Sequence, residues 1–425
     1  MRVIAAIAAL SFVAAADELP PHVLQLARLR ANMRQHLATI PDYTCLSVTE
    51  RYRLDPKSRT LRLVDRVRLE VAYVGQRELY AWPDENEFHS DAPAEMIGSG
   101  MFGSGDFVSH ARAAFTGNYD VTRYAGESTV SGRELLRWDY SISPMFTNWT
   151  VGSGFITAHS GAAGSYWVDP QTLDLQTLEV RTQGLPPDFP INEVRTVIEY
   201  ARTRIGSREI VLPQRSVTSL SERSGLLSEN RTEFSHCRQY AAQSVVRYLA
   251  PEAALRSAPG QEPASVQELQ LAAGLRVQTA LDTPIDSRTA VVGQSIQASV
   301  TEDVRRGKDF VIPRGAGLTG RLRRLEFNPG PPPSHIIALE FTELSFGNFR
   351  ARFLASMTYI GIETGARIRT TTRSTAEGTW TQTVTMNYAL KETPGVGTFV
   401  IEREPVQLPA GLQMVWTTLD IRSRK

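Results

Sequence analysis

Residues 166–180 read YWVDPQTLDLQTLEV, and this stretch has the pattern of a β-hairpin. Asp169-Pro170 begins a turn, because proline restricts φ and an aspartate side chain can bond to the backbone two residues on. Apolar residues lie on both sides of the turn, as they do in strands that pack on a core. The stretch therefore predicts two antiparallel strands joined by a tight turn.

The same two-residue period occurs elsewhere in the first half of the chain. Its apolar positions include Val67, Leu69, Val71, Tyr73, Trp138, Tyr140 and Ile142. Residues 43–54 show the spacing as well, with Leu46, Val48, Tyr52 and Leu54 on one side. Successive side chains of a strand point to opposite faces. The pattern therefore predicts an antiparallel sheet with one apolar face and one face in water.

Two helices are expected beside these strands. Residues 22–39 place Leu26, Leu29, Met33 and Leu37 at helical spacing, and Pro41 ends the segment. Residues 95–105 are glycine-rich and predict a loop. The apolar residues that follow, Phe107, Val108, Ala111 and Phe115, predict a short helix lying against the sheet.

The N-terminus has the features of a secretory signal peptide over residues 1–16. Arg2 is followed by an apolar run from Val3 to Val13 and by three alanines. The run is too short to cross about 30 Å of hydrocarbon, and no other stretch of the sequence is long and apolar enough to be a transmembrane helix. We expect an exported protein of the bacterial envelope, either periplasmic or secreted.

Composition and charge exclude several classes of function. The 46 basic and 45 acidic residues give a net charge of +1, so no overall field favours nucleic acid as a partner. The seven histidines are scattered through the sequence without metal-ligand spacing. We therefore expect neither a metal nor a cofactor.

Cys45 and Cys237 are the two cysteines of the chain. In an oxidising compartment a lone pair of cysteines usually forms a disulfide. A bridge between them would close a very long loop, for which chain entropy gives about 4–5 kcal/mol of stabilisation. The alternative is two separate buried thiols.

The chain divides into two predicted β domains. Residues 17–245 carry the first set of strands, and residues 246–270 read as a linker with Pro251, Pro259 and Pro263. Residues 271–425 contain many short candidate strands separated by turn residues, which predicts a small β-barrel or sandwich. The expected fold class is mainly β with a few helices.

The hairpin at residues 166–180 resembles the W-V-D-P-x-T hairpin of the LolA-like outer-membrane lipoprotein carriers and their periplasmic relatives. The early helix, the long strands and the glycine-rich helical interruption extend the resemblance. Those proteins fold as an incomplete barrel whose concave apolar face holds acyl chains under plug helices. The resemblance implies a curved antiparallel half-barrel with plug helices in the first domain. Neither the disulfide nor the second domain belongs to the carrier pattern.

The second domain has a resemblance of its own. Residues 310–321 read FVIPRGAGLTGR and follow Val291-Val292-Gly293. Together they resemble the core of the TrbI-type β-barrel domain of type IV secretion outer-membrane rings. Pro313 and Gly315 would form a tight turn, and Gly320 would permit a bend or bulge. The long apolar helices of a membrane pore are not found in the sequence, so a channel function is not expected.

The expected function is non-enzymatic binding of a lipid or lipidated protein in the concave face. The expected lining residues are Val67, Leu69, Val71, Trp138, Tyr140 and Trp167, with Phe102 and Phe107 as a lid. The same residues could instead form a filled core, because apolar strand faces are usually core. A scaffolding component of the envelope, bound to another envelope protein, is the alternative function.

An exported hydrolase is the third hypothesis. Asp106, Ser109 and His110 supply the residue types of acyl transfer. Ser109 and His110, however, are neighbours in sequence and would point in different directions on a helix. Residues 98–103 fit the dinucleotide pattern G-x-G-x-x-G, but residues 91–95 before them do not form the buried strand that this motif requires.

Overall fold

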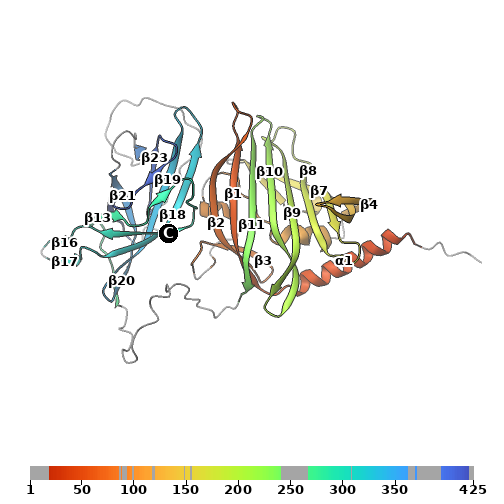
Figure 1. Ribbon diagram of the computed structural model, residues 1–425, viewed down its shortest axis with the longest axis horizontal. Coiled ribbons are helices and arrows are strands. Elements are labelled where there is room, and N and C mark those ends of the chain that lie inside the picture. The colour runs from red at the N-terminus through yellow and green to blue at the C-terminus, as the bar shows by residue number, and fades with distance from the viewer. Residues whose placement is uncertain are drawn as a thin grey trace, which may run out of the picture.

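The computed structural model describes residues 19–85, 88, 93–97, 100–116, 120–147, 149–153, 156–240, 267–307, 309–361, 369–370 and 394–420. The predicted signal peptide and residues 246–266 of the predicted linker lie outside the described residues. Figure 1 shows two β bodies side by side, with the first-half strands in one and the second-half strands in the other.

The first body is an eleven-stranded antiparallel sheet. Its strands run in the order β3 (Arg77–Ala81), β2 (Leu61–Val74), β1 (Tyr43–Leu54), β11 (Leu227–Gln239), β10 (Arg208–Glu222), β9 (Ile191–Ile205), β8 (Leu175–Gln183), β7 (Ile156–Val168), β5 (Arg133–Ile142) and β4 (Asp120–Val130), with β6 (Trp149–Ser153) paired to β7. The sheet curls into a half-barrel (Figure 1), as predicted. The predicted hairpin is β7 and β8, in which Tyr166 is opposite Leu178.

Helices cover the concave side and one end of this sheet. They are α1 (Pro21–Thr39), α2 (Pro93–Ile97) and α3 (Ser109–Thr116), and a 3₁₀ turn spans Pro144–Phe146. The α1 helix lies at the end of the sheet away from the second body (Figure 1), and it buries Leu29, Met33 and Leu37. Both predicted helices are therefore present, with the apolar residues facing the sheet.

Aromatic side chains fill the half of the concave face beneath α1 and α3. The Phe115 ring lies 4.8 Å from Tyr166, and the Phe107 ring lies 4.8 Å from Tyr43. Trp138 is completely buried beside Tyr166. This half of the half-barrel is packed as a core.

On β1 and β11 the concave face carries several polar side chains. On β1 the buried side chains include Ser47 and Arg51, while Leu46 and Val48 on the opposite face are only partly buried. Thr49 and Thr232 share a hydrogen bond of 2.9 Å across β1 and β11. The apolar spacing of residues 43–54 therefore marks the outer face of this strand.

Cys45 and Cys237 form a disulfide, which confirms the predicted bridge. The two residues lie at an irregularity in the pairing of β1 with β11, between Thr44 and Leu46. The bridge therefore joins neighbouring strands that are 192 residues apart in sequence.

The second body is a ten-stranded sheet. Its strands are β12 (Gln267–Glu268), β20 (Phe349–Arg352), β19 (Ser334–Phe346), β18 (Gly317–Asn328), β15 (Ser295–Val300), β13 (Arg276–Leu281), β25 (Gln413–Thr418) and β21 (Ala355–Ile360) in order, with β23 (Val396–Ile401) on β19 and β22 (Arg369–Thr370) on β23. Two short ladders pair β14 (Ile285–Asp286) with β24 (Gln407–Leu408), and β16 (Val304–Arg306) with β17 (Asp309–Ile312). Trp416 lies at the centre of the core, edge-on to Phe341.

The turn predicted at Pro313-Arg314-Gly315 connects β17 to β18, and Ala316 N donates to Pro313 O at 3.1 Å. The β18–β19 pairing shifts register at Gly320, as a bulge there requires. These local features agree with the expected strand pattern, and the TrbI-type resemblance itself stays a prediction.

The two bodies meet along β2 and the segment that follows β3. Arg68 N donates to Val292 O and Val292 N donates to Arg66 O, both at 2.8 Å. Gly293 has φ +94°, and a Cβ on it would lie 2.4 Å from Arg68 O, so a residue without a side chain is required for this approach. One hydrophobic cluster includes residues of both sheets. That the bodies fold as separate domains stays a prediction.

Candidate functional site

The eight predicted ligand-binding residues fall into three environments. Val67, Leu69, Phe102 and Phe107 surround a cavity of about 50 Å³. Val71, Trp138 and Tyr140 lie in the filled core and are at most 4% exposed. Trp167 points away from the concave face. On the outer face its Nε1 donates to Ser128 Oγ at 2.9 Å. The two-residue period of β7 turns Tyr166 and Val168 inward and Trp167 outward.

A larger cavity of about 380 Å³ lies further along the concave face, and it is the candidate site. Its roof is residues 101–106 together with Ser109 and His110, and residues 149–152 of β6 form one wall. The floor consists of inward side chains of β8, β9 and β10, namely Val180, Thr182, Val194, Thr196, Thr218 and Leu220. The volume is within the usual range for a small-molecule site, about 300–1,000 Å³.

One end of this cavity is apolar. Val151, Val194 and Leu220 line it, and they also pack on a small cluster that is separate from the main core. The buried members of that cluster are Ala158, Phe189 and Ile191. Phe102 adds an aromatic side chain from the roof.

The roof is anchored to β3 by Glu78, which is 8% exposed. Its carboxylate accepts hydrogen bonds from Gly105 N at 3.0 Å, Val108 N at 2.9 Å and Ser109 N at 2.8 Å. Ser109 Oγ donates to the same carboxylate at 2.7 Å. Asn230 Nδ2 adds a further tie to Met101 O at 2.9 Å.

The polar end of the cavity is formed by Asp106 and His110. His110 Nε2 lies 3.5 Å from Asp106 Oδ1, and Ser216 Oγ donates to Asp106 Oδ2 at 2.6 Å. The His110 ring rests edge-on against Trp149, with centroids 4.7 Å apart. On the floor, the hydroxyls of Thr196 and Thr218 are 3.0 Å apart and hydrogen-bonded.

This arrangement does not assemble the acid–His–Ser set of the hydrolase hypothesis. Ser109 Oγ donates to Glu78, so it is not directed at His110. Asp106 lies between His110 and Ser216, whereas a catalytic triad needs the histidine between the acid and the nucleophile. The residues present provide hydrogen-bonding groups around an apolar space.

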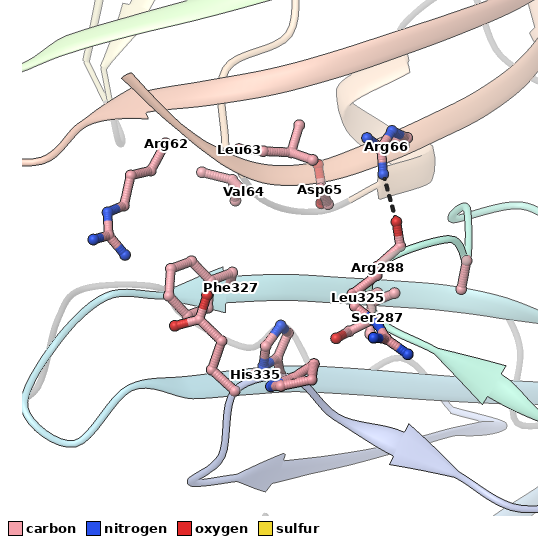
Figure 2. A pocket seen from close by; sticks show the side chains of 13 residues that line it. Arg62, Leu63, Val64, Asp65, Arg66, Ser287, Arg288, Leu325, Phe327 and His335 are labelled. Atoms are coloured by element: carbon pink, nitrogen blue, oxygen red, sulfur yellow. Dashed lines mark hydrogen bonds between the residues drawn. The ribbon is translucent and has the colours of Figure 1, made fainter. Parts of the chain in front are cut away.

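A second cavity, of about 360 Å³, lies between the two bodies. Figure 2 shows the β2 residues Arg62–Arg66 on one side of it and Leu325, Phe327 and His335 on the other. Arg66 spans the gap and donates to the backbone oxygen of Arg288 at 3.0 Å.

Three arginines of this second cavity pair with carboxylates of the protein. Arg62 pairs with Asp55 at 3.1 Å, Arg66 pairs with Glu50 at 2.8 Å, and Arg288 pairs with Asp286. Burial lowers the pKa of His335, whose Nδ1 lies 3.0 Å from the Arg403 carbonyl and is oriented by it. We therefore interpret this cavity as part of the seam between the bodies.

Within the described residues, no group of three His, Cys, Asp or Glu side chains could hold a metal ion. Among the same residues, no helix is long and apolar enough to cross a membrane.

Sequence reasoning missed the floor of the candidate site. Thr196 and Thr218 lie at inward positions of β9 and β10, next to apolar inward residues such as Ile198. A threonine at an inward position of a strand is the signal that could have located the cavity, because burying a hydroxyl in a filled core is costly unless it has a hydrogen-bond partner.

No family model matches the chain, and comparison with curated proteins finds no relative. Two solved structures are similar to it. A DUF1329 family protein from Desulfovibrio piger aligns with a TM-score of 0.29 and 13% identity, over 53% of this chain and 95% of that chain. A protein domain from Vibrio parahaemolyticus, described as outer membrane lipoprotein-sorting, aligns with a TM-score of 0.27 and 8% identity, over 52% and 94%. TM-scores this low support no statement about what the chain does.

Proposed function

We propose that this chain is a non-enzymatic protein of the cell envelope that binds an apolar or amphiphilic ligand, a lipid or the acyl chain of a lipidated protein, in the 380 Å³ cavity of its half-barrel. The observation that carries the proposal is the division of this cavity into an apolar end and a polar end. Val151, Val194 and Leu220 suit a hydrocarbon chain, and Asp106 with His110 suits a polar head.

The roof supports the proposal because it covers the cavity while the aromatic side chains that follow it in sequence stay packed. Glu78 holds the start of α3, so Phe107 and Phe115 stay in the aromatic core while residues 101–106 cover the cavity. A ligand could enter here without unpacking the aromatic half of the sheet.

A filling variant tests the proposal. Leu220→Trp should occupy the apolar end, and Val217→Trp on the outer face of the same strand is the matched control. With N-phenyl-1-naphthylamine as a fluorescent probe, we expect Leu220→Trp to weaken binding at least about tenfold, equivalent to about 1.4 kcal/mol. Val217→Trp should leave the affinity unchanged, and thermal unfolding should show that both variants are folded.

Absence of probe binding by the wild-type protein would contradict the proposal, as would equal binding by Leu220→Trp. The alternative function is then a scaffold, which the continuous hydrophobic cluster shared by the two bodies favours. Mass spectrometry of small molecules that co-purify with the native protein separates the two functions independently, since a scaffold retains none.

A further inference from the structure

Asp106 keeps hydrogen-bonding capacity toward the cavity. Its side chain is 17% exposed, and Ser216 Oγ donates to Oδ2 at 2.6 Å. His110 Nε2 is 3.5 Å from Oδ1, which is longer than the usual limit of about 3.2 Å for N–H···O. An ionised carboxylate has about four acceptor positions. Oδ1 can therefore accept a hydrogen bond from a group placed in the cavity.

Asp106 is the one carboxylate among the described residues that line the cavity. Among the described residues that line the cavity, Asp106 and His110 are the titratable ones, and none is arginine or lysine. An anionic head group beside Asp106 would meet a carboxylate at short range in a poorly solvated site, where repulsion is strong. A hydroxyl or ammonium group would donate to the same carboxylate, and a charge-assisted bond of this kind is stronger than a neutral one.

From these contacts we infer that the cavity selects amphiphiles whose head donates a hydrogen bond and carries no negative charge, such as an alcohol or an ammonium group, over fatty acid anions. The inference rests on the proposed function, because it assumes that the apolar end holds a chain. The head lies at Asp106, and the chain extends toward Val194 and Leu220.

Displacement of N-phenyl-1-naphthylamine from the full chain tests the inference. Decanol, decylamine and decanoate have chains of equal length, and at about pH 8 the decanoate head is an anion. We expect decanol or decylamine to displace the probe at a concentration at least about tenfold lower than decanoate does. A preference for the amine over the alcohol would assign a cationic head, and equal potency of the two would assign a hydrogen-bond donor that is either neutral or cationic.

Variants connect the selectivity to Asp106. In Asp106→Asn, the concentration of decanoate that displaces the probe should lie within about threefold of the concentration of decanol, because the substitution removes the charge and keeps the shape of the side chain. Glu193→Gln, next to Val194 but on the other face of β9, changes the net charge equally and should leave the selectivity as in the wild type. Ser216→Ala keeps the carboxylate of Asp106 and frees its second oxygen, so this variant should discriminate against decanoate as the wild type does. It provides a second test if Asp106→Asn does not fold.

Wild-type displacement by decanoate at the same concentration as decanol and decylamine would overturn this inference and leave the proposed function intact. Retention of the full selectivity in Asp106→Asn would overturn it as well. Failure of the probe to bind would overturn both the proposed function and the inference.

Discussion

Glu78 holds the end of the roof and the start of α3 on β3. Its carboxylate accepts three backbone N–H groups and one hydroxyl from residues 105–109, which lie about thirty positions away in sequence, as the separations of 27 to 31 residues show. The amides at the start of a helix lack partners within the helix, and an anion there is favoured by the helix dipole. Gly105 has φ +110°, and a Cβ there would lie 3.0 Å from His110 Nε2, so the turn before α3 is restricted to glycine.

We expect Glu78→Gln to destabilise the protein by about 1–3 kcal/mol, because an amide has one acceptor oxygen and leaves buried donors unpaired. Hydrogen exchange at Val108 and Ser109 should accelerate, and urea unfolding measures the change in stability. Glu70→Gln is the control, since Glu70 pairs with the exposed Arg238 and should contribute less than about 1 kcal/mol. A roof that exchanges at the wild-type rate in Glu78→Gln would show that its position does not depend on this carboxylate.

The sequence identified which residues alternate along a strand, but not which face becomes concave. Val67 and Leu69 lie on the inner face beside the cavity of about 50 Å³, whereas the period places Trp167 on the outer face together with its neighbour Arg137, whose guanidinium lies 5.3 Å from the indole. Glu78 has no local signal of its role, because its partners belong to a segment that only the tertiary fold brings to it.

At the scale of elements, the pairing of β1 with β11 brings the first and last strands of the half-barrel together. These strands are neighbours in space, and the Cys45–Cys237 disulfide covalently links them where their pairing is irregular. The individual strands could be predicted from their period, as could the disulfide. The position of β6, which turns back along β7 and closes one wall of the cavity, could not be predicted, because strand order depends on long-range pairing.

Replacing both cysteines with serine should lower the free energy of unfolding by about 2–5 kcal/mol, because the unfolded chain regains the freedom of a long loop. The check is urea unfolding of Cys45→Ser/Cys237→Ser against the oxidised wild type. Reduced wild-type protein is the control and should resemble the double variant. Equal stability of all three would contradict the expected contribution of the bridge.

At the scale of the whole molecule, buried histidines predict a loss of stability in acid. Burial lowers the pKa of His335 beside the seam and of His36 on α1. Because the folded pKa lies below the unfolded value, the unfolded chain binds protons first as the pH falls. The contribution of these neutral histidines to the free energy of unfolding should be complete above about pH 6.5 and decline as the pH falls through the pKa of the folded state.

His335→Gln should reduce this acid sensitivity, since glutamine can still donate to the Arg403 carbonyl but does not titrate. The measurement is Tm against pH for the wild type and the variant. The difference between the two Tm values should be constant above about pH 6.5 and change only below it. His159→Gln, at an exposed position, is the control. Parallel curves for His335→Gln and the wild type would contradict the prediction.

The seam between the bodies also reaches the roof. Arg323 on β18 donates to Met96 O at the end of α2 at 3.0 Å, lies over the Trp82 ring at 4.8 Å and pairs with Glu340 at 2.6 Å. Arg321 beside it pairs with Glu85 at 3.1 Å. The second body therefore holds the segment from which the roof begins, which suggests that removing these contacts loosens the cavity without altering its lining.

The double change Arg323→Met/Glu340→Gln tests this coupling. Methionine keeps an apolar stem on Trp82, and glutamine avoids a buried carboxylate that has lost its cation. We expect faster hydrogen exchange at α2 and residues 101–106, and faster release of the fluorescent probe, because a less stable region opens more often. Arg350→Met, which removes an exposed arginine 3.8 Å from Glu343 on the same sheet, should change neither rate. If the double variant exchanges and releases probe as the wild type does, the second body does not hold the roof, and its contacts within the first body, through Glu78 and Asn230, set its mobility.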